Sequence, residues 1–171
     1  MDAYGHGLGK IEILPLYPID DHEDAAFGLY KRINRRDLER IFWWQQEPVT
    51  FRSFLEYFAK RRLLLALYDH EGEFLGVAWI EGMVGKQKCE LGAWATFSAR
   101  GLNAVELMKE VLDFAHGKLG FRSVFCHTPW KTAFALCRRA GLHTVAIIGD
   151  YPLKDFDTTL YIMRSDRDRE L

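Results

Sequence analysis

Several segments of this chain alternate between apolar and polar positions, a pattern that predicts β-strands. The segment 87–97, for example, places Cys89 and Leu91 on one face of a strand and Glu90 on the other. Further segments have strand character either by alternation or as short apolar runs between turn residues. The predicted strands are 11–17, 63–68, 74–81, 87–97, 122–127, 142–149 and 156–164.

Apolar residues spaced three or four positions apart predict helices between these strands, as in the series that contains Val105 and Met108. Gly120 and Gly141 follow two of the helices and are suitable C-terminal stops, whereas Thr50 is a suitable N-cap. The predicted helices are 22–34, 36–46, 50–60, 102–119 and 130–140.

The order of these elements predicts the fold class. A strand and three helices come first, three strands joined by short turns follow, and helices and strands then alternate up to two final strands. We expect a mixed α/β (α+β) domain, with a central mixed sheet of six or seven strands and helices on both faces. No internal repeat and no Pro/Gly/Ser-rich linker divides the chain, so residues 1–171 are expected to form one domain.

Charge and composition narrow the possible partners. Lys and Arg number 23 and Asp and Glu number 24, a formal net charge of -1. Proteins that bind nucleic acids usually carry a basic excess, so we expect no nucleic-acid partner. No apolar run reaches the roughly 18 residues that a membrane-spanning helix needs. The first residues also lack the pattern of a signal peptide, and no membrane partner is expected.

The thiol and imidazole side chains give no sign of a metal site. Cys89, Cys126 and Cys137 include no C-x-x-C pair, and the six histidines include no H-x-x-x-H pair. We therefore expect no metal and no disulfide framework. An odd number of cysteines without such a framework favours a reducing, cytoplasmic location.

The passage from the strand at 87–97 into the following helix contains the first candidate binding motif. Arg100 and Gly101 stand immediately before the helix, and Ala104 lies in its first turn. A helix N-terminus presents unpaired N–H groups and a partial positive charge, which suit an anion such as a phosphate. An ordinary capped helix start is the alternative interpretation.

The helix at 130–140 contains the second motif. Ala133, Cys137, Arg139 and Gly141 follow the spacing A-x-x-x-C-x-R-x-G. The small alanine permits a close approach between the helix and a ligand, and the glycine can end the helix in a left-handed turn.

The element order and these two motifs resemble the GNAT superfamily of N-acetyltransferases over nearly the whole chain. That superfamily has a glycine-rich turn after its fourth strand and an A-x-x-x-Y-x-K-x-G-F helix after its fifth. The resemblance implies acetyl-CoA as co-substrate, bound where the fourth and fifth strands splay apart, and acetyl transfer to a primary amine of a small molecule or a protein. The cofactor-binding residues that it implies are Ala95, Phe97, Ser98, Arg100, Gly101, Leu102, Asn103, Ala104, Trp130 and Ala133.

Three departures from the family pattern bear on catalysis. Asn103 stands where a second glycine is common, and Trp130 stands roughly where the family often has an asparagine. Cys137 replaces the tyrosine that often protonates the departing CoA thiolate. Such losses resemble divergent GNAT-like proteins of phages and prophages. The alternatives are therefore a GNAT-like binding or structural protein of phage origin that has lost catalysis, and a transferase that uses another acyl-CoA.

Acetyl transfer needs a group that accepts the amine proton and a group that protonates the thiolate. Glu90 is the first candidate base, because burial beside Trp94 on the same strand face would raise its pKa. A solvent-exposed Glu90 is the alternative, and Glu81 is the second candidate base. Cys137 is the candidate acid or a buried packing residue, and His127 is a proton relay or a structural histidine.

The aromatic cluster Phe42-Trp43-Trp44 lies between the first two strands, a region that lines the acceptor pocket in GNAT proteins. Trp44 shares the helical face of Ile41 and is expected in the core. Trp43 lies off that face, which leaves it open to exposure. The alternatives for the pair are packing in the core, which is favoured, and contact of one of the two with an apolar acceptor or with the second subunit of a homodimer.

Overall fold

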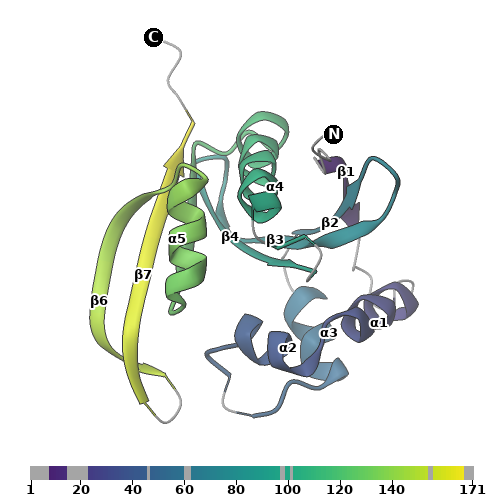
Figure 1. Cartoon of the computed structure of the whole chain (residues 1–171), viewed down its shortest axis with the longest axis horizontal. Helices are drawn as coiled ribbons and strands as arrows, with labels where there is room; N and C mark the ends of the chain where they lie inside the picture. Colours follow the sequence, from purple (N-terminus) through teal and green to yellow (C-terminus); the bar gives the residue numbers. More distant parts are fainter. Residues whose placement is uncertain are drawn as a thin grey trace, which may run out of the picture.

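Seven strands of the described chain form one mixed sheet in the order β1-β2-β3-β4-β5-β7-β6. Figure 1 shows β1 to β4 on one side of the molecule and β6 and β7 on the other. The computed structural model describes residues 8–14, 23–45, 47–59, 63–96, 99–100, 102–153 and 156–167. The strands are β1 (Leu8–Leu14), β2 (Leu63–Asp69), β3 (Phe74–Val84), β4 (Lys88–Ala95), β5 (Ser123–Thr128), β6 (His143–Leu153) and β7 (Phe156–Asp166). Only β4 and β5 are parallel neighbours. The predicted mixed sheet of six or seven strands is confirmed.

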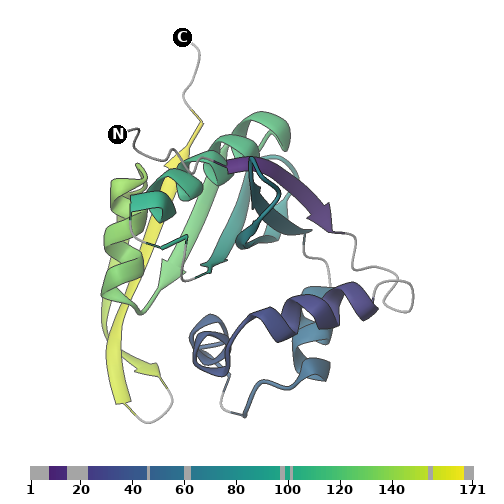
Figure 2. The ribbon, with the colours of Figure 1, turned by 45° about the vertical axis from the view of Figure 1, so that its right-hand side comes forward.

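Helices cover both faces of this sheet, as predicted (Figures 1 and 2). The first three helices pack on one face, and the later helices pack on the other. The helices are α1 (Glu23–Arg32), α2 (Arg35–Ile41), α3 (Phe51–Ala59), α4 (Leu102–Asp113), the π-helical turn η2 (Phe114–Lys118) and α5 (Lys131–Arg139). None of the described helices is long and apolar enough to cross a membrane.

Strand alternation explains why the chain has two apolar cores. On β3 and β4, Ile80 and Leu91 face the core beneath α4 and α5, whereas Val77 and Trp79 face the core beneath α1 to α3. Gly92 permits this arrangement, because a Cβ atom there would lie 2.1 Å from the Trp79 ring. The large indole can therefore lie directly against β4.

Two helices differ in length from the prediction. The helix predicted over 36–46 ends at Ile41, because Phe42 leaves the helical conformation with φ -98° and ψ 42°. The helix predicted over 102–119 is α-helical only to Asp113 and continues as the π-helical turn. The N-cap predicted at Thr50 is confirmed, since its Oγ1 accepts a hydrogen bond from the Ser53 N–H at 3.2 Å.

The parallel pair β4 and β5 is joined only over a short stretch. Residues 88–90 of β4 pair with residues 123–125 of β5, and beyond this point the two strands separate. β4 continues to Ala95 and β5 to Thr128 without pairing to each other. The splay predicted between the fourth and fifth strands is confirmed. It leaves backbone N–H and C=O groups on these two edges without a strand partner.

Candidate active site between the splayed strands

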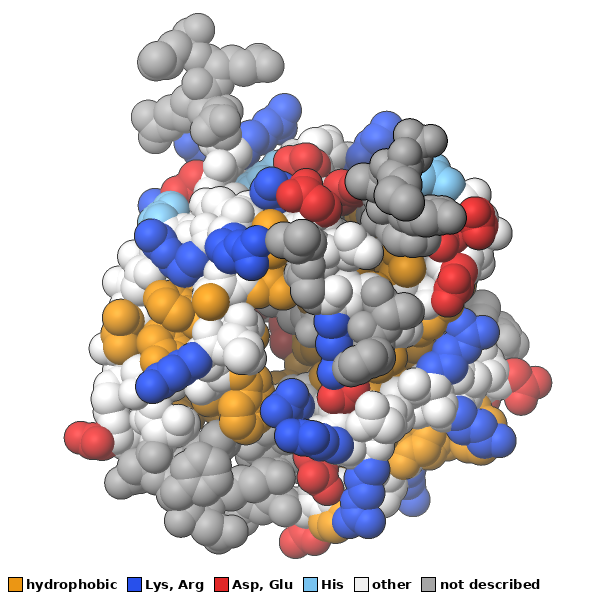
Figure 3. All heavy atoms as spheres, viewed as in Figure 1, with side chains coloured by type: hydrophobic (Ala, Val, Ile, Leu, Met, Phe, Trp, Pro, Cys, Tyr) orange, Lys and Arg blue, Asp and Glu red, His pale blue; other side chains and the backbone are white. Residues whose placement is uncertain are grey.

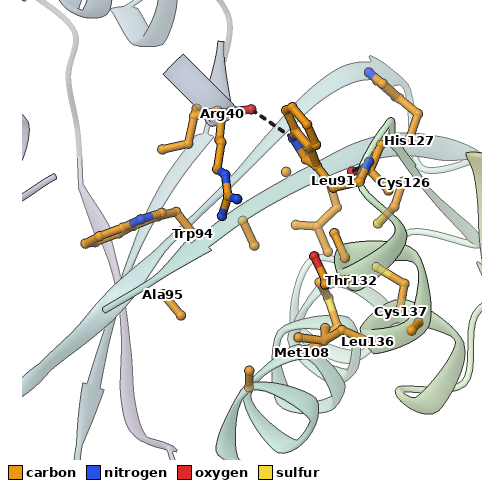
Figure 4. A pocket seen from close by; sticks show the side chains of 18 of the residues that line it. Arg40, Leu91, Trp94, Ala95, Met108, Cys126, His127, Thr132, Leu136 and Cys137 are labelled. Carbon is orange, nitrogen blue, oxygen red and sulfur yellow. Dashed lines mark hydrogen bonds between the residues drawn. The ribbon is translucent and has the colours of Figure 1, made fainter. Parts of the chain in front are cut away.

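A pocket of about 570 Å³ opens where β4 and β5 separate (Figure 4). This volume suits a small-molecule ligand. The walls are residues 91–95 of β4, 126–128 of β5, 104, 105 and 108 of α4, and 132, 133, 135, 136, 137 and 139 of α5. Residues of α2 close one side. The space-filling view shows a hollow in this part of the molecule, with Lys and Arg side chains at its rim (Figure 3).

The predicted cofactor-binding residues gather partly around this pocket. Those that line it are Ala95, Arg100, Ala104, Trp130 and Ala133. Leu102 and Asn103 form the start of α4. Phe97, Ser98 and Gly101 lie outside the described residues.

A buried carboxylate, Asp37 of α2, joins the helical layer to the start of α4. It accepts hydrogen bonds from Trp94 Nε1 at 2.9 Å and from Asn34 Nδ2 at 2.9 Å, and it forms a salt bridge with Arg100. Arg100 Nε also donates to the Ala95 carbonyl oxygen at 3.1 Å. Burial alone would raise the pKa of Asp37, but these hydrogen bonds and the guanidinium charge together lower it below its usual value.

Two thiols face each other in the wall of the pocket. Cys137 of α5 and Cys126 of β5 are both buried, and their side chains point toward one another (Figure 4). The hydrogen bond between the thiols, together with burial, raises the pKa of Cys126 well above its usual value. The same hydrogen bond lowers the pKa of Cys137, while burial opposes this effect. Cys137 therefore contributes a thiol to the pocket wall, next to that of Cys126.

The candidate bases lie at the edge of the pocket rather than inside it. The Glu90 side chain is 46% exposed, so the predicted burial beside Trp94 is wrong. Its Oε2 lies 3.8 Å from Nδ1 of His127, and His127 itself lines the pocket. Glu81 pairs with Glu90 across β3 and β4, and it accepts a hydrogen bond from the Tyr57 hydroxyl at 2.7 Å. The geometry thus joins Glu90 to the pocket through His127.

Of the two tryptophans after α2, Trp44 does not have its predicted core position. Trp43 is buried, with 8% of its surface exposed, whereas Trp44 is 42% exposed. The prediction is wrong because α2 ends at Ile41, so the helical face of Ile41 does not extend to Trp44. The chain instead turns Trp43 toward His127 and Tyr151, whose rings lie 6.1 and 5.9 Å from it.

Four of the residues that line the pocket gave no sign in the sequence that they belong to a binding site. Asp37, Arg40, Trp79 and Thr128 line the pocket, yet each fits an ordinary helix or strand pattern. The sequence around Asp37 contains only a helix-capping pattern. The Asn34 side chain accepts a hydrogen bond from the Asp37 N–H at 2.9 Å at the start of α2. That pattern marks a helix start and says nothing about a pocket.

Comparisons with known proteins agree with this geometry at the level of the fold. No model of a known protein family and no curated protein sequence matches the chain. Solved structures do match. Spermidine N-acetyltransferase from Vibrio cholerae, in complex with CoA and spermine, has a TM-score of 0.69 at 14% identity, with 91% of this chain and 95% of that chain covered.

Two further structures extend this likeness. A candidate acetyltransferase from Acinetobacter baylyi has a TM-score of 0.71 at 14% identity, with 93% of both chains covered. A candidate phosphinothricin N-acetyltransferase has a TM-score of 0.67 at 18% identity, with 94% of this chain and 100% of that chain covered. The chain has the GNAT fold.

The residues at the GNAT splay fit a long, narrow ligand such as the arm of acetyl-CoA. The open backbone edge at residues 91–95 offers hydrogen-bonding groups to an amide-containing chain. Ala93 is exposed at this edge, and Ala133 of α5 also lines the pocket, so no bulky side chain fills the space at these two positions. The start of α4, adjacent to Ala104, presents helix N–H groups that suit a phosphate.

Proposed function

We propose that this protein is an N-acetyltransferase that moves the acetyl group of acetyl-CoA to a primary amine. The observation that carries the proposal is the open edge of β4, residues 91–95, facing a pocket of about 570 Å³ in a GNAT fold. In this assignment the backbone of residues 91–95 holds the pantetheine arm. The start of α4 holds the pyrophosphate. The GNAT-fold neighbour solved with CoA supports the choice of co-substrate.

The proposed reaction uses three side chains at the pocket. A bond forms between the amine nitrogen and the acetyl carbon, and the bond between that carbon and the CoA sulfur breaks. His127, whose Nδ1 lies 3.8 Å from Oε2 of Glu90, takes the proton that the amine loses. Cys137 is the proposed proton donor to the CoA sulfur. Glu81 is the weaker candidate for the base, because it does not line the pocket and the Tyr57 hydroxyl already bonds to it.

Calorimetry with acetyl-CoA tests the proposal directly. Ala93→Trp should fill the gap between the splayed strands and abolish binding, because Ala93 is exposed at the edge of β4 inside the pocket. Val84→Trp is the matched control, since Val84 is 53% exposed near the end of β3 and does not line the pocket. Unmeasurable binding by the unaltered protein, or equal binding by both variants, would contradict the proposal.

The finer features of this function are proposals as well. The acceptor is an amine of a small molecule or a protein, residues 1–171 act as one domain, and the location is cytoplasmic, as three free thiols suggest. The alternative of a GNAT-like protein that has lost catalysis gains no support from neighbours that are N-acetyltransferases. A phage origin stays a prediction that these neighbours do not support.

A homodimer is also proposed, formed through the edge strand β6. Val145, Ile147 and Ile148 of this strand are exposed, and apolar side chains gather over β6 in the space-filling view (Figure 3). An exposed apolar edge strand is a surface that proteins usually cover. Light scattering should give twice the chain mass, and Ile147→Lys should return the monomer mass. A monomer mass for the unaltered protein contradicts this proposal.

A further inference from the structure

One side of the pocket is built from indole rings. Trp43, Trp79, Trp94 and Trp130 all line it, and they come from four different parts of the chain. Trp43 packs edge-on against His127, with ring centroids 6.1 Å apart. The proposed base therefore lies beside an aromatic surface. Indole rings favour a flat apolar group, which can stack on them or meet their edges.

The same pocket has no carboxylate available for a cationic ligand. Among the described residues that line it, Asp37 carries the only carboxylate, and the salt bridge with Arg100 and two further hydrogen bonds occupy it. Glu90 stands behind His127, outside the lining. A polyamine such as spermine would bring several ammonium groups into this space without carboxylates to replace their water, which is costly.

Arg40 supplies a positive charge to the same pocket. Its guanidinium extends into the pocket toward Trp94 (Figure 4), and it lies 5.7 Å from the centre of the Trp130 ring. No carboxylate of the described chain pairs with it. Arg139 also lines the pocket, but it ends α5, about 13 Å along the helix from Trp130. Among the described residues that line the pocket, Arg40 is therefore the cation on the aromatic side that has no carboxylate partner.

We infer that the acceptor is an aromatic amino acid, whose ring lies among the indoles and whose carboxylate binds Arg40. A guanidinium and a carboxylate can form two parallel hydrogen bonds, which fixes the position of the ligand as well as its charge. The amine would then lie between Arg40 and the proposed acetyl position, within reach of His127. This inference rests on the proposed function. In the balanced reaction, the amino acid and acetyl-CoA give the N-acetyl amino acid and CoA.

The decisive comparison uses amines that differ in a single group. L-Phenylalanine and 2-phenylethylamine differ only in the carboxylate, and L-alanine keeps the carboxylate without the ring. With acetyl-CoA present, release of CoA thiol should give kcat/KM for L-phenylalanine at least about tenfold above that for 2-phenylethylamine or L-alanine. Spermidine should be the poorest acceptor. A preference for spermidine, or equal use of L-phenylalanine and 2-phenylethylamine, overturns the inference.

The role of Arg40 is tested by substitution on one helix. Arg40→Gln should bring the ratio of kcat/KM between L-phenylalanine and 2-phenylethylamine close to one, chiefly by weakening the use of L-phenylalanine. Arg36→Gln is the matched control, because Arg36 is an exposed residue of α2 that does not line the pocket. It should keep the ratio of the unaltered protein. A ratio that survives Arg40→Gln overturns the assignment of the carboxylate site.

Direct binding separates this inference from the proposed function. Quenching of tryptophan fluorescence reports binding of L-phenylalanine or 2-phenylethylamine, and calorimetry reports binding of acetyl-CoA. If acetyl-CoA binds while the protein neither binds nor acetylates L-phenylalanine, the function stands and the inference fails. If L-phenylalanine binds in an Arg40-dependent way and acetyl-CoA does not bind, the proposed transfer fails, and the pocket is assigned as an amino-acid site alone.

Discussion

Asp37 bonds to side chains from three parts of the chain, so Asp37→Asn should lower the free energy of unfolding by about 2–4 kcal/mol. The carboxylate accepts hydrogen bonds from Trp94 and Asn34 and pairs with Arg100. Hydrogen bonds to a charged group are worth about 1.5–3 kcal/mol each. The expected loss is smaller than the sum of these hydrogen-bond energies for two reasons. The Arg100 side chain is 39% exposed and can bond to water instead, and the amide oxygen of asparagine still accepts one hydrogen bond.

Urea unfolding at neutral pH measures this loss, with Glu39→Gln as the control. Glu39 lies on the same helix in an exposed pair with Arg35, so its substitution should cost less than about 0.5 kcal/mol. In thermal unfolding, the Asp37→Asn loss corresponds to a fall in Tm of roughly 4–16 °C. If Asp37→Asn proves no more costly than Glu39→Gln, the reasoning about the buried carboxylate is refuted.

The pH dependence of this difference has a definite sign. The pKa of Asp37 is lowered in the folded protein, so its stabilisation is fully present above the unfolded value of about 3.9. It is lost as the pH falls through the lower folded pKa. The gap between the unaltered protein and Asp37→Asn should therefore be constant at neutral pH and shrink only below about pH 4. A gap that closes near pH 6 would point to another group.

Three further predictions concern the pocket and the strands around it. Glu90→Gln should reduce turnover by about 10²–10⁴ and leave acetyl-CoA affinity unchanged in calorimetry; unchanged turnover removes Glu90 from the mechanism. Iodoacetamide at pH 8 should label Cys137 before Cys89, because burial and the Glu90 charge raise the pKa of Cys89 to about 12; peptide mass mapping that finds Cys89 labelled first contradicts this. Gly92→Ala should cost about 2 kcal/mol or more in urea unfolding, because its Cβ would lie 2.1 Å from the buried Trp79 ring; an unchanged midpoint contradicts it.

The strands and helices around the site could be predicted from the sequence, because they depend on local periodicity. Alternation along β4 assigned Leu91 and Glu90 to opposite faces, and the structure has them there. The order of strands and helices was enough to expect the splay, which depends on topology rather than on particular side chains. Each described strand overlaps the range predicted for it, while residues 15–17 of the first predicted strand and residue 97 of the fourth lie outside the described residues.

The contacts inside the site could not be predicted in the same way. Asp37 bonds to residues 57 and 63 positions further along the chain, and periodicity gives a face but no partner. Trp44 was assigned to the core by extending a helix, but the chain leaves the helical conformation at Phe42, so Trp44 is exposed and Trp43 is buried. The exposure of Glu90 likewise depends on packing between strands that no local pattern records.

The short pairing of β4 with β5 also has a mechanical consequence. Among the described residues, the strand pairing between the first four strands and the last three consists of three residue pairs, 88–90 with 123–125. The aperture between the two halves is therefore set by the core beneath it, where Leu112 of α4, Val124 of β5 and Met163 of β7 pack together. Because packed interiors resist compression and transmit strain, the position of one half of the sheet relative to the other depends on this packing. A change of volume among these core residues, of which only Met163 lines the pocket, is therefore expected to alter the width of the opening.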